Sequence, residues 1–494
     1  MDDFISIDFF LEMEKKYDMY SKEVLGINYW NYVRFNLWNY DICSAEFGLK
    51  SPHNTGLNSK IKVILSDLIE LKNGLFHSGR TVRKKNILIY SHERRIKQDD
   101  LYYCPYTSVI SKEYNDNSVT IETPAARKHF RPIPENNIIY TDLINIGSQV
   151  SLILKKKAHN DYAVLCDAIT RDIEGFVGEI QKHYNWKTEL DHIVRKCADM
   201  VIITVYEKKK FSKLLDRIRP RVIIEVVGYS NERMTLNELA KDRGIPVIEL
   251  QHGTVYENHA AYQYGVDSGI KQFPDYIFTF SEFWNNRMRV PIPNDHLISV
   301  GYPHFEDEIA RYSKDARRDP RITILFISQG TIGQELAALA VKLSQMLSEE
   351  QYRLIFKLHP SEVAVWKERY NGLSDTNIEV KGKDGHSLYE LFAISDIQIG
   401  VYSTAVYEGL GFGLKTYIYK IGHYMDMRSL VDEGWAEYIS DENEAYRCIC
   451  ECDSNKSVNR KDYETFWMKG AKLNIIKELN MIIYGYLSNT DRRG

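Results

Sequence analysis

The sequence predicts an α/β protein with two doubly wound parallel sheets and a helical segment in front of them. Three observations support this prediction. The chain has 494 residues, which is too many for a single hydrophobic core. Between residues 86 and 419, short apolar runs alternate with stretches of helical periodicity, which is typical of strand–helix–strand units. The charged stretch 313–321 separates these units into two series and is the expected linker.

The N-terminal segment, residues 1–84, is expected to be helical and to carry many aromatic side chains. The first 40 residues contain 11 aromatic residues, and Trp30, Arg34 and Trp38 would share one face of a helix. Because aromatic side chains dominate protein cores, we expect this segment to pack on the first α/β domain. The alternative is a surface for a glycan or a lipid headgroup, since Trp and Tyr suit interfaces that are apolar on one side and wet on the other.

The first α/β domain is expected over residues 85–312. Its candidate strands are 86–90, 200–205, 222–227, 246–250, 276–280 and 297–300. A helix from Thr235 to Arg243 precedes one of them and closes on Gly244, a residue suited to ending a helix. Strands joined by helices in this way run parallel with both faces covered, which predicts a Rossmann-like domain.

The second α/β domain is expected over residues 322–434 and repeats the same alternation. Its candidate strands are 322–327, 352–357, 378–380, 397–399 and 416–419. This pattern predicts a second Rossmann-like domain. Residues 435–494 are expected to form helices that pack back on the body of the protein.

Composition and cysteine usage exclude several classes of protein. Lys and Arg total 64 against 68 Asp and Glu, a net charge of -4, so a broad nucleic-acid-binding surface is not expected. The 7 cysteines are odd in number and mostly widely spread, which indicates reduced thiols in the cytoplasm. Cys448, Cys450 and Cys452 lack a second pair at zinc-ligand spacing, so no metal site is predicted. The acidic start does not resemble a signal peptide, and no run approaches the ~20 apolar residues that span a bilayer. We expect a cytoplasmic protein whose contact with a membrane, if any, is peripheral.

Three clusters of polar residues follow the carboxyl ends of predicted strands, where ligands bind in open α/β sheets. In the first, a strand ends at Gly400, and Ser403 or Thr404 begins a helix whose free N–H groups and dipole attract a phosphate. Glu408 lies about one turn further, ~6 Å along the axis, which suits a ribose diol. The alternative is an ordinary helix cap with a Glu in its second turn.

The second and third clusters each contain a histidine. Lys357 and His359, followed by Pro360, could bind diphosphate oxygens and stabilise a leaving group. His252, followed by Gly253, could deprotonate a hydroxyl, because the ordinary pKa of imidazole lies near neutrality. A structural histidine in a loop is the alternative at both positions. Gly330, in the loop after the strand 322–327, is a further candidate for ligand binding.

These motifs resemble those of bacterial GT-B glycosyltransferases. The pairs His359–Pro360 and Ser403–Thr404 resemble the HP and S-S/T motifs of sialyltransferases and capsule polymerases, in which they bind the phosphate of a CMP-sugar. The same pairs, together with His252–Gly253, also resemble the CDP-glycerol glycerophosphotransferases of teichoic-acid synthesis, whose first histidine is the proposed general base. The position of Glu408 resembles that of the ribose-binding glutamate of many GT-B enzymes.

The resemblance implies an inverting, metal-independent glycosyltransferase of surface polysaccharide synthesis (capsule, O-antigen or related) with a GT-B fold. Its donor would be a CMP-, CDP- or UDP-linked sugar bound between the domains, and its acceptor a glycan or a lipid-linked group. No further cofactor is implied. His252 would be the general base, with Glu232 and His92 as alternatives. The remaining candidates would bind the donor, its phosphate through Lys357, His359, Ser403 and Thr404, and its ribose through Glu408.

Two departures keep other functions open. The D/E-D/E-G motif that carries the sialyltransferase base has no match in the first domain, and no Asp-x-Asp motif stands out. A CDP-glycerol-type glycerophosphotransferase is therefore an alternative. A nucleotide-sugar 2-epimerase would share the fold, but its usual Asp-Ser-Gly-Gly stretch is absent where residues 401–404 stand. A non-catalytic glycan-binding protein is the remaining alternative.

Overall fold

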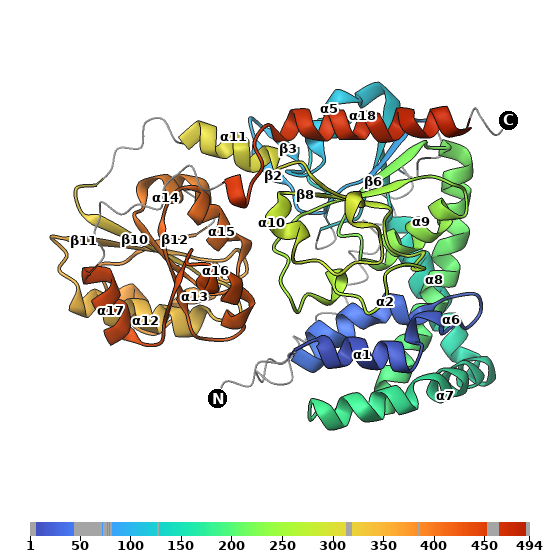
Figure 1. The fold of residues 1–494 in the computed structure, drawn as a ribbon, viewed down its shortest axis with the longest axis horizontal. Helices are drawn as coiled ribbons and strands as arrows, with labels where there is room; N and C mark the ends of the chain where they lie inside the picture. The colour runs from blue at the N-terminus through green and yellow to red at the C-terminus, as the bar shows by residue number, and fades with distance from the viewer. Residues whose placement is uncertain are drawn as a thin grey trace.

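The computed structural model of the protein describes residues 6–43, 72, 77, 79, 82–125, 128–312, 319–382, 386–451 and 464–490. Two parallel sheets, each flanked by helices, form the two main bodies of the molecule (Figure 1). The predicted linker 313–321 lies mostly outside the described residues, and so does the larger part of residues 44–84.

The first sheet has seven parallel strands. Their order is β5 (Ile138–Tyr140), β4 (Ser118–Glu122), β1 (Ile87–Tyr90), β6 (Val222–Val226), β7 (Val247–Leu250), β8 (Tyr276–Thr279) and β9 (Leu297–Ser299). The sheet begins at the interior strand β1 and adds β4 and β5 on one side. The chain then crosses back and adds β6 to β9 on the other side. Strands β1, β4, β6 and β7 are buried along their whole length, because helices cover both faces of the sheet.

The second sheet has six strands and the same winding. Their order is β12 (Glu379–Lys381), β11 (Tyr352–Lys357), β10 (Ile322–Ile327), β13 (Ile397–Gly400), β14 (Lys415–Tyr419) and β15 (Glu437–Ile439). All neighbouring pairs run parallel. In both sheets the strand order reverses beside the first strand, which defines a doubly wound domain. The predicted fold class, two Rossmann-like domains, is therefore confirmed.

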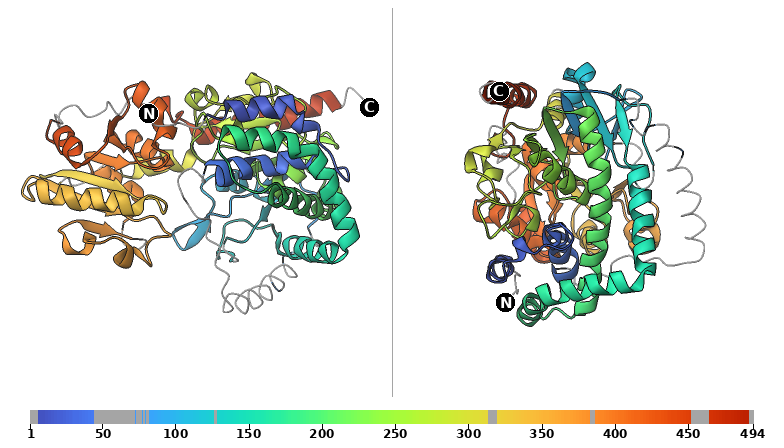
Figure 2. Two further views of the ribbon diagram at one scale, coloured as in Figure 1. Left: turned by 90° about the horizontal axis from the view of Figure 1, so that it is seen from below. Right: turned by 90° about the vertical axis from the view of Figure 1, so that its right-hand side faces the viewer.

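Helices cover the faces of both sheets. Those of the first domain are α5 (Ser108–Glu113), α6 (Asp142–Lys157), α7 (His159–His183), α8 (Leu190–Ile218), α9 (Asn231–Lys241), α10 (Glu282–Asn285) and α11 (Pro303–Tyr312). Those of the second are α12 (Gly333–Met346), α13 (Trp366–Arg369), α14 (Leu388–Ile394), α15 (Thr404–Gly411), α16 (Arg428–Asp432) and α17 (Glu442–Cys450). A short antiparallel pair, β2 (Ile96–Gln98) and β3 (Leu101–Tyr103), follows β1. The long helices α6 and α8 lie side by side (Figure 2).

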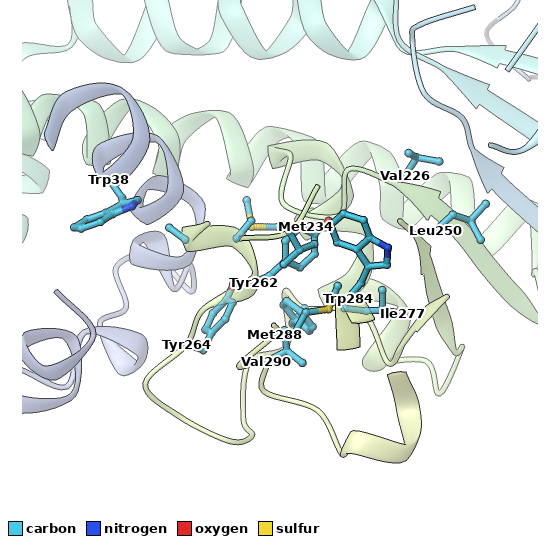
Figure 3. Packing of buried hydrophobic residues seen from close by; sticks show 14 of the residues in the cluster. Trp38, Val226, Met234, Leu250, Tyr262, Tyr264, Ile277, Trp284, Met288 and Val290 are labelled. Carbon is cyan, nitrogen blue, oxygen red and sulfur yellow. The ribbon is translucent and has the colours of Figure 1, made fainter. Parts of the chain in front are cut away.

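The N-terminal segment packs on the first domain through α1 (Asp8–Lys16), α2 (Tyr29–Asn36) and the π-helix η2 (Leu37–Ile42). Trp30 is 1% exposed and Trp38 is fully buried. The indole N–H of Trp38 donates to the carbonyl of Asn258 at 2.8 Å, and Trp38 belongs to the same buried cluster as Tyr262 and Tyr264 (Figure 3). Trp30 and Trp38 therefore belong to the core and offer no surface for a glycan or a lipid.

Two of the expected elements are wrong. Residues 200–205, predicted as a strand, lie inside α8, whose buried side chains recur at helical spacing, as at Ile193, Cys197 and Val201. A short apolar run does not distinguish a buried strand from a helix. Beyond Gly434 the chain is not purely helical, because β15 forms the edge of the second sheet.

The C-terminal helix α18 (Ala471–Thr490) returns to the first domain. It packs against α11, and the Tyr114 hydroxyl donates to Asn480 Oδ1 at 2.8 Å (Figure 1). Just before it, the indole ring of Trp467 lies 4.9 Å from the ring of Phe280. In the described parts of the chain, none of the helices combines the length and the apolar character needed to cross a membrane.

Candidate functional site

In each domain the strand order reverses at one position in the sheet, and the loops that follow the two strands beside this position diverge. In the first domain these are the loops after β1 and β6, and in the second the loops after β10 and β13. Ligands of doubly wound domains bind at such positions because the two loops diverge there and leave a crevice. In the second domain, Tyr402 N–H donates to Gln329 Oε1 at 3.2 Å, which joins the two loops.

A hydrogen bond between the domains brings two of the predicted clusters together. The backbone N–H of Thr254 donates to Thr404 Oγ1 at 3.2 Å. Thr254 lies two residues after His252, and Thr404 is the first residue of α15. A Cβ atom at Gly253 would lie 3.5 Å from Thr404 Oγ1, so the two loops are in van der Waals contact.

Helix α15 begins with a side-chain cap. Ser403 is its N-cap, and the Ser403 hydroxyl accepts from the Ala405 N–H at 3.1 Å. The Ser403 hydroxyl therefore acts as an ordinary helix cap, which was the alternative to phosphate binding. The backbone N–H groups of Ser403 and Thr404 donate to no acceptor among the described residues. The helix start thus keeps two donors that could bind an anion.

Glu408 lies one turn further along α15 and is 9% exposed. The Tyr389 hydroxyl donates to Glu408 Oε1 at 2.8 Å. Burial raises the pKa of Glu408 to about 7, although the Tyr389 hydrogen bond and the charge of Arg94 oppose this shift. The carboxyl group can therefore either accept or donate a hydrogen bond near neutral pH.

His359 and Gly330 lie next to each other in the loops after β11 and β10. His359 Nδ1 is 2.8 Å from Ser361 Oγ, and the His359 N–H donates to Glu362 Oε2 at 2.6 Å. A Cβ atom at Gly330 would lie 2.8 Å from Ser361 Oγ, so only glycine fits there without displacing that side chain. Partial burial lowers the pKa of His359, Glu362 raises it, and Arg94 lowers it.

Lys357 has other partners. Its ammonium donates to the carbonyls of Gly382 at 2.5 Å and His386 at 3.2 Å, both beyond the end of the neighbouring strand β12. Burial lowers its pKa. Two of its three N–H donors are therefore used by these two carbonyls, on the side of β11 away from β13.

His252 lies half-buried in the loop after β7. Its Nε2 is 3.2 Å from the Tyr229 hydroxyl, and the Tyr106 hydroxyl donates to its carbonyl at 2.8 Å. Its Nδ1 is buried and has no hydrogen-bond partner among the described residues. Burial lowers the pKa of His252 well below its ordinary value, and the neighbouring His92 and His259 imidazoles and the Arg94 guanidinium disfavour its cation further. The imidazole is therefore neutral at pH 7 and can accept a proton.

The alternative bases lie in different surroundings. His92 Nδ1 accepts from the Arg94 N–H at 2.8 Å, and the His92 and His252 rings are 5.9 Å apart. Burial lowers the pKa of His92 to about 3. Glu232 belongs to the first turn of α9, where burial raises its pKa, and its nearest cation is Arg233 at 3.9 Å.

Sequence reasoning missed Arg94, which lies four residues after the end of β1. Its guanidinium is exposed and forms no hydrogen bond or ion pair with the described residues. Its charge lowers the pKa of His92 and His252 in the first domain, and of His359 and Glu408 in the second. An unpaired cation therefore lies within electrostatic reach of candidates from both domains. The sequence did offer one indication of this residue, because Arg94 is a basic residue in the loop that follows the first predicted strand.

Groups that could hold a metal ion are absent from the described residues, where no three His, Cys, Asp or Glu side chains gather as ligands. Cys448 and Cys450 are free thiols, and Cys452 lies outside the described residues.

Comparison with known proteins shows no matching family model and no matching curated protein. Among solved structures, the UDP-GlcNAc 2-epimerase from Methanocaldococcus jannaschii aligns over 80% of this chain and 99% of its own, at 13% identity and a TM-score of 0.49. The UDP-GlcNAc 2-epimerase from Neisseria meningitidis bound to UDP-GlcNAc aligns over 80% of this chain and 98% of its own, at 11% identity and a TM-score of 0.48. The wall teichoic acid polymerase TagF aligns over 87% of this chain and 98% of its own, at 9% identity and a TM-score of 0.45. Similarity at this level does not decide the function.

Proposed function

We propose that this protein is an inverting, metal-independent glycosyltransferase of surface polysaccharide synthesis that binds a nucleotide-sugar between its two domains. The observation that carries the proposal is the Thr254–Thr404 hydrogen bond, because it joins the loop of His252 to the start of α15. A general base and an anion-binding helix start are the two parts that such a transfer needs, and the loop of His252 and the start of α15 supply one candidate for each.

The donor phosphate is bound by groups of both domains in this proposal. The free N–H groups at Ser403 and Thr404 bind it from the second domain together with His359, and Arg94 binds it from the first. An unpaired guanidinium suits this role because it offers several N–H donors in one plane. Glu408, one turn along α15, binds the ribose.

Two residues assist these groups. Gly330 leaves space for the Ser361 side chain, which contacts His359, and so supports the position of that imidazole. Lys357 supports the backbone at Gly382 and His386, whose carbonyls it binds.

His252 acts as the general base. If its Nε2–H donates to the Tyr229 hydroxyl, the lone pair is on Nδ1, the nitrogen without a partner. The acceptor must displace the side chains that cover Nδ1 to reach it. Nδ1 then takes the proton of the acceptor hydroxyl, whose oxygen attacks the anomeric carbon. The bond from that carbon to the phosphate oxygen breaks, and its electron pair leaves with the nucleotide, stabilised by Arg94 and the helix start. A bound phosphate raises the low pKa of His252, because opposite charge favours the cation.

A CDP-glycerol-type glycerophosphotransferase is the second candidate, favoured by the His252–Gly253 pair at the same junction. The base and the anion site would be the same, but the acceptor oxygen would attack phosphorus, and CMP would leave. In either case the acceptor is a glycan or a lipid-linked group, which the protein would meet in the cytoplasm or at the membrane surface.

A thermal-shift screen with CMP, CDP, UDP, GDP and TDP tests the proposal. A ligand that binds only the folded protein raises the melting temperature, so one of these nucleotides should stabilise the parent protein. The matching activated donors should then release free nucleotide slowly by hydrolysis, and its identity names the donor class. A protein that no nucleotide stabilises, and that hydrolyses no donor, would overturn the proposed function.

A further inference from the structure

A buried carboxylate holds the loop that carries His359 by three hydrogen bonds. Glu362 lies three residues after His359 and is 2% exposed. Its Oε2 accepts the His359 N–H at 2.6 Å, and its Oε1 accepts the Ser328 hydroxyl at 2.9 Å and the hydroxyl of Tyr370. Three donors thus share two oxygens, which suits an ionised carboxylate, because that group only accepts hydrogen bonds.

These hydrogen bonds join two loops of the second domain. Ser328 is the first residue after β10, whereas His359 lies in the loop after β11. A glycine of the first loop leaves room for the contact, because a Cβ atom at Gly333 would collide with Glu362 Oε1 and with the Tyr370 hydroxyl. The loop after β10 is therefore shaped to accommodate this carboxylate.

The loop after β10 is in turn attached to the start of α15. Gln329 Oε1 accepts the Tyr402 N–H at 3.2 Å, and Gln329 Nε2 donates to the Tyr402 carbonyl at 3.4 Å. Tyr402 directly precedes Ser403, the N-cap of α15. Glu362 and Gln329 therefore connect the loop of His359 to the helix start by way of the loop after β10.

The charge of Glu362 also acts on the imidazole of His359. Partial burial lowers the pKa of His359, Glu362 raises it, and Arg94 from the first domain lowers it. The Ser361 hydroxyl, 2.8 Å from Nδ1, is an uncharged neighbour. Glu362 thus opposes burial and Arg94 and favours the imidazolium, which binds a phosphate more strongly than the neutral ring does.

We propose that Glu362 is a positioning residue of the donor site, whose carboxylate fixes His359 relative to the start of α15 so that both can bind one phosphate. The inference rests on the proposed function, since it takes His359 as a phosphate ligand. It extends that function by assigning the placement of this ligand to a residue that is itself buried away from the donor.

Two variants separate the hydrogen bonds of Glu362 from its charge. In Glu362→Gln the amide oxygen still accepts the His359 N–H. The amide N–H groups can donate to the hydroxyls of Ser328 and Tyr370, since a hydroxyl both donates and accepts. The loops then stay joined while the charge is lost, whereas Glu362→Ala removes both. Glu368→Gln, at an exposed residue of α13, is the matched control.

The first measurement follows the imidazole itself. NMR of the protein with isotope-labelled histidine gives the titration curve of His359, whose signal is the one missing in His359→Asn. Its midpoint should move to lower pH in Glu362→Gln, because the charge that favours the imidazolium is gone. A midpoint equal to that of the parent would overturn the influence of Glu362 on His359. This measurement needs no nucleotide, so it tests the pair even if the proposed function fails.

The second measurement is calorimetric titration with CMP, CDP, UDP, GDP and TDP. Glu362→Ala should weaken the binding of the nucleotide that the parent binds by about tenfold or more, the scale of a lost hydrogen bond to a charged group. Glu362→Gln should lose less, and its loss should shrink as the pH falls through the His359 titration, a dependence that a purely structural role would not produce. The control should match the parent.

The remaining outcomes separate this inference from the proposed function. Folded Glu362→Ala and Glu362→Gln proteins that bind the nucleotide as the parent does would overturn the positioning role and leave the proposed function intact. A loss in Glu362→Gln that is the same at every pH would reduce Glu362 to a structural residue and overturn the role as well. Failure of all five nucleotides to bind the parent would instead reject the proposed function itself.

Discussion

The buried carboxylate of Glu14 offers the sharpest test of how the N-terminal segment is attached. Glu14 is fully buried and accepts hydrogen bonds from three side chains. Arg34 donates to it at 2.7 and 2.8 Å, the Trp30 indole at 2.6 Å and the Tyr20 hydroxyl at 2.5 Å. Arg34 also donates to the carbonyls of Ala260 and Gln263, so this one cluster ties the segment to the first domain.

Glu14→Ala should be strongly destabilising. It leaves the guanidinium of Arg34, itself 1% exposed, without its counter-charge. Breaking one partner of a buried ion pair costs about 3–5 kcal/mol. The orphaned Trp30 and Tyr20 donors act in the same direction, but they share one acceptor with Arg34, so their costs do not simply add. Glu14→Gln should fall between Ala and the parent, because its amide oxygen still accepts.

Differential scanning calorimetry measures the effect. The transition that contains the first domain should move down by about 5–10 °C in Glu14→Ala, from the usual relation between stability and melting temperature in larger domains. The transition of the second domain should not move. Glu12→Ala, an exposed residue of the same helix, is the matched control. If Glu14→Ala melts no earlier than Glu12→Ala, the pair does not stabilise the fold as argued.

Three further predictions concern the junction. His252→Ala should leave donor affinity nearly unchanged and slow transfer by about 100-fold or more, with loss of the acidic limb of the pH–rate profile; a stable variant with near-normal transfer would end this role. Arg94→Ala should weaken nucleotide binding about tenfold or more, as for a lost hydrogen bond to a charged group. The control Arg447→Ala, at an exposed residue, should bind as the parent does, and equal titration curves for the two variants would contradict the role of Arg94. Burial raises the pKa of Glu408 from 4.5 to about 7, so its contribution to stability is present below pH 4.5 and lost as the pH rises through 7. The parent should therefore lose stability against Glu408→Gln across that window in denaturant unfolding, and parallel curves would refute the assignment.

The two Rossmann-like domains could be predicted because their signal is local. Each strand or helix of these domains, such as the long apolar strands β10 and β11, is formed by consecutive residues whose pattern is visible in the sequence. The same local signal failed at 200–205, where an apolar run inside α8 has the composition of a strand. It also missed β5 and β15, which have only 3 residues each, and β4, which has 5.

The candidate residues at strand ends were found for a similar reason. A polar loop after a buried strand is visible in the sequence, and parallel sheets collect such loops at one edge. That reasoning identified His252, His359 and Ser403 as candidates, but it could not say what each side chain already binds. Lys357 reads as a phosphate ligand in sequence, yet its ammonium holds two backbone carbonyls.

Which residues contact one another depends on the tertiary structure. Thr254 and Thr404 are 150 positions apart and form one hydrogen bond. Arg34 links Glu14 to the carbonyls of Ala260 and Gln263, which lie more than 200 residues further along the chain. Arg94 carries no motif. It stands out because the fold leaves its guanidinium without a partner among the described residues, near candidates from both domains. Such pairing depends on the packing of the whole chain, so no stretch of sequence, read by itself, contains it.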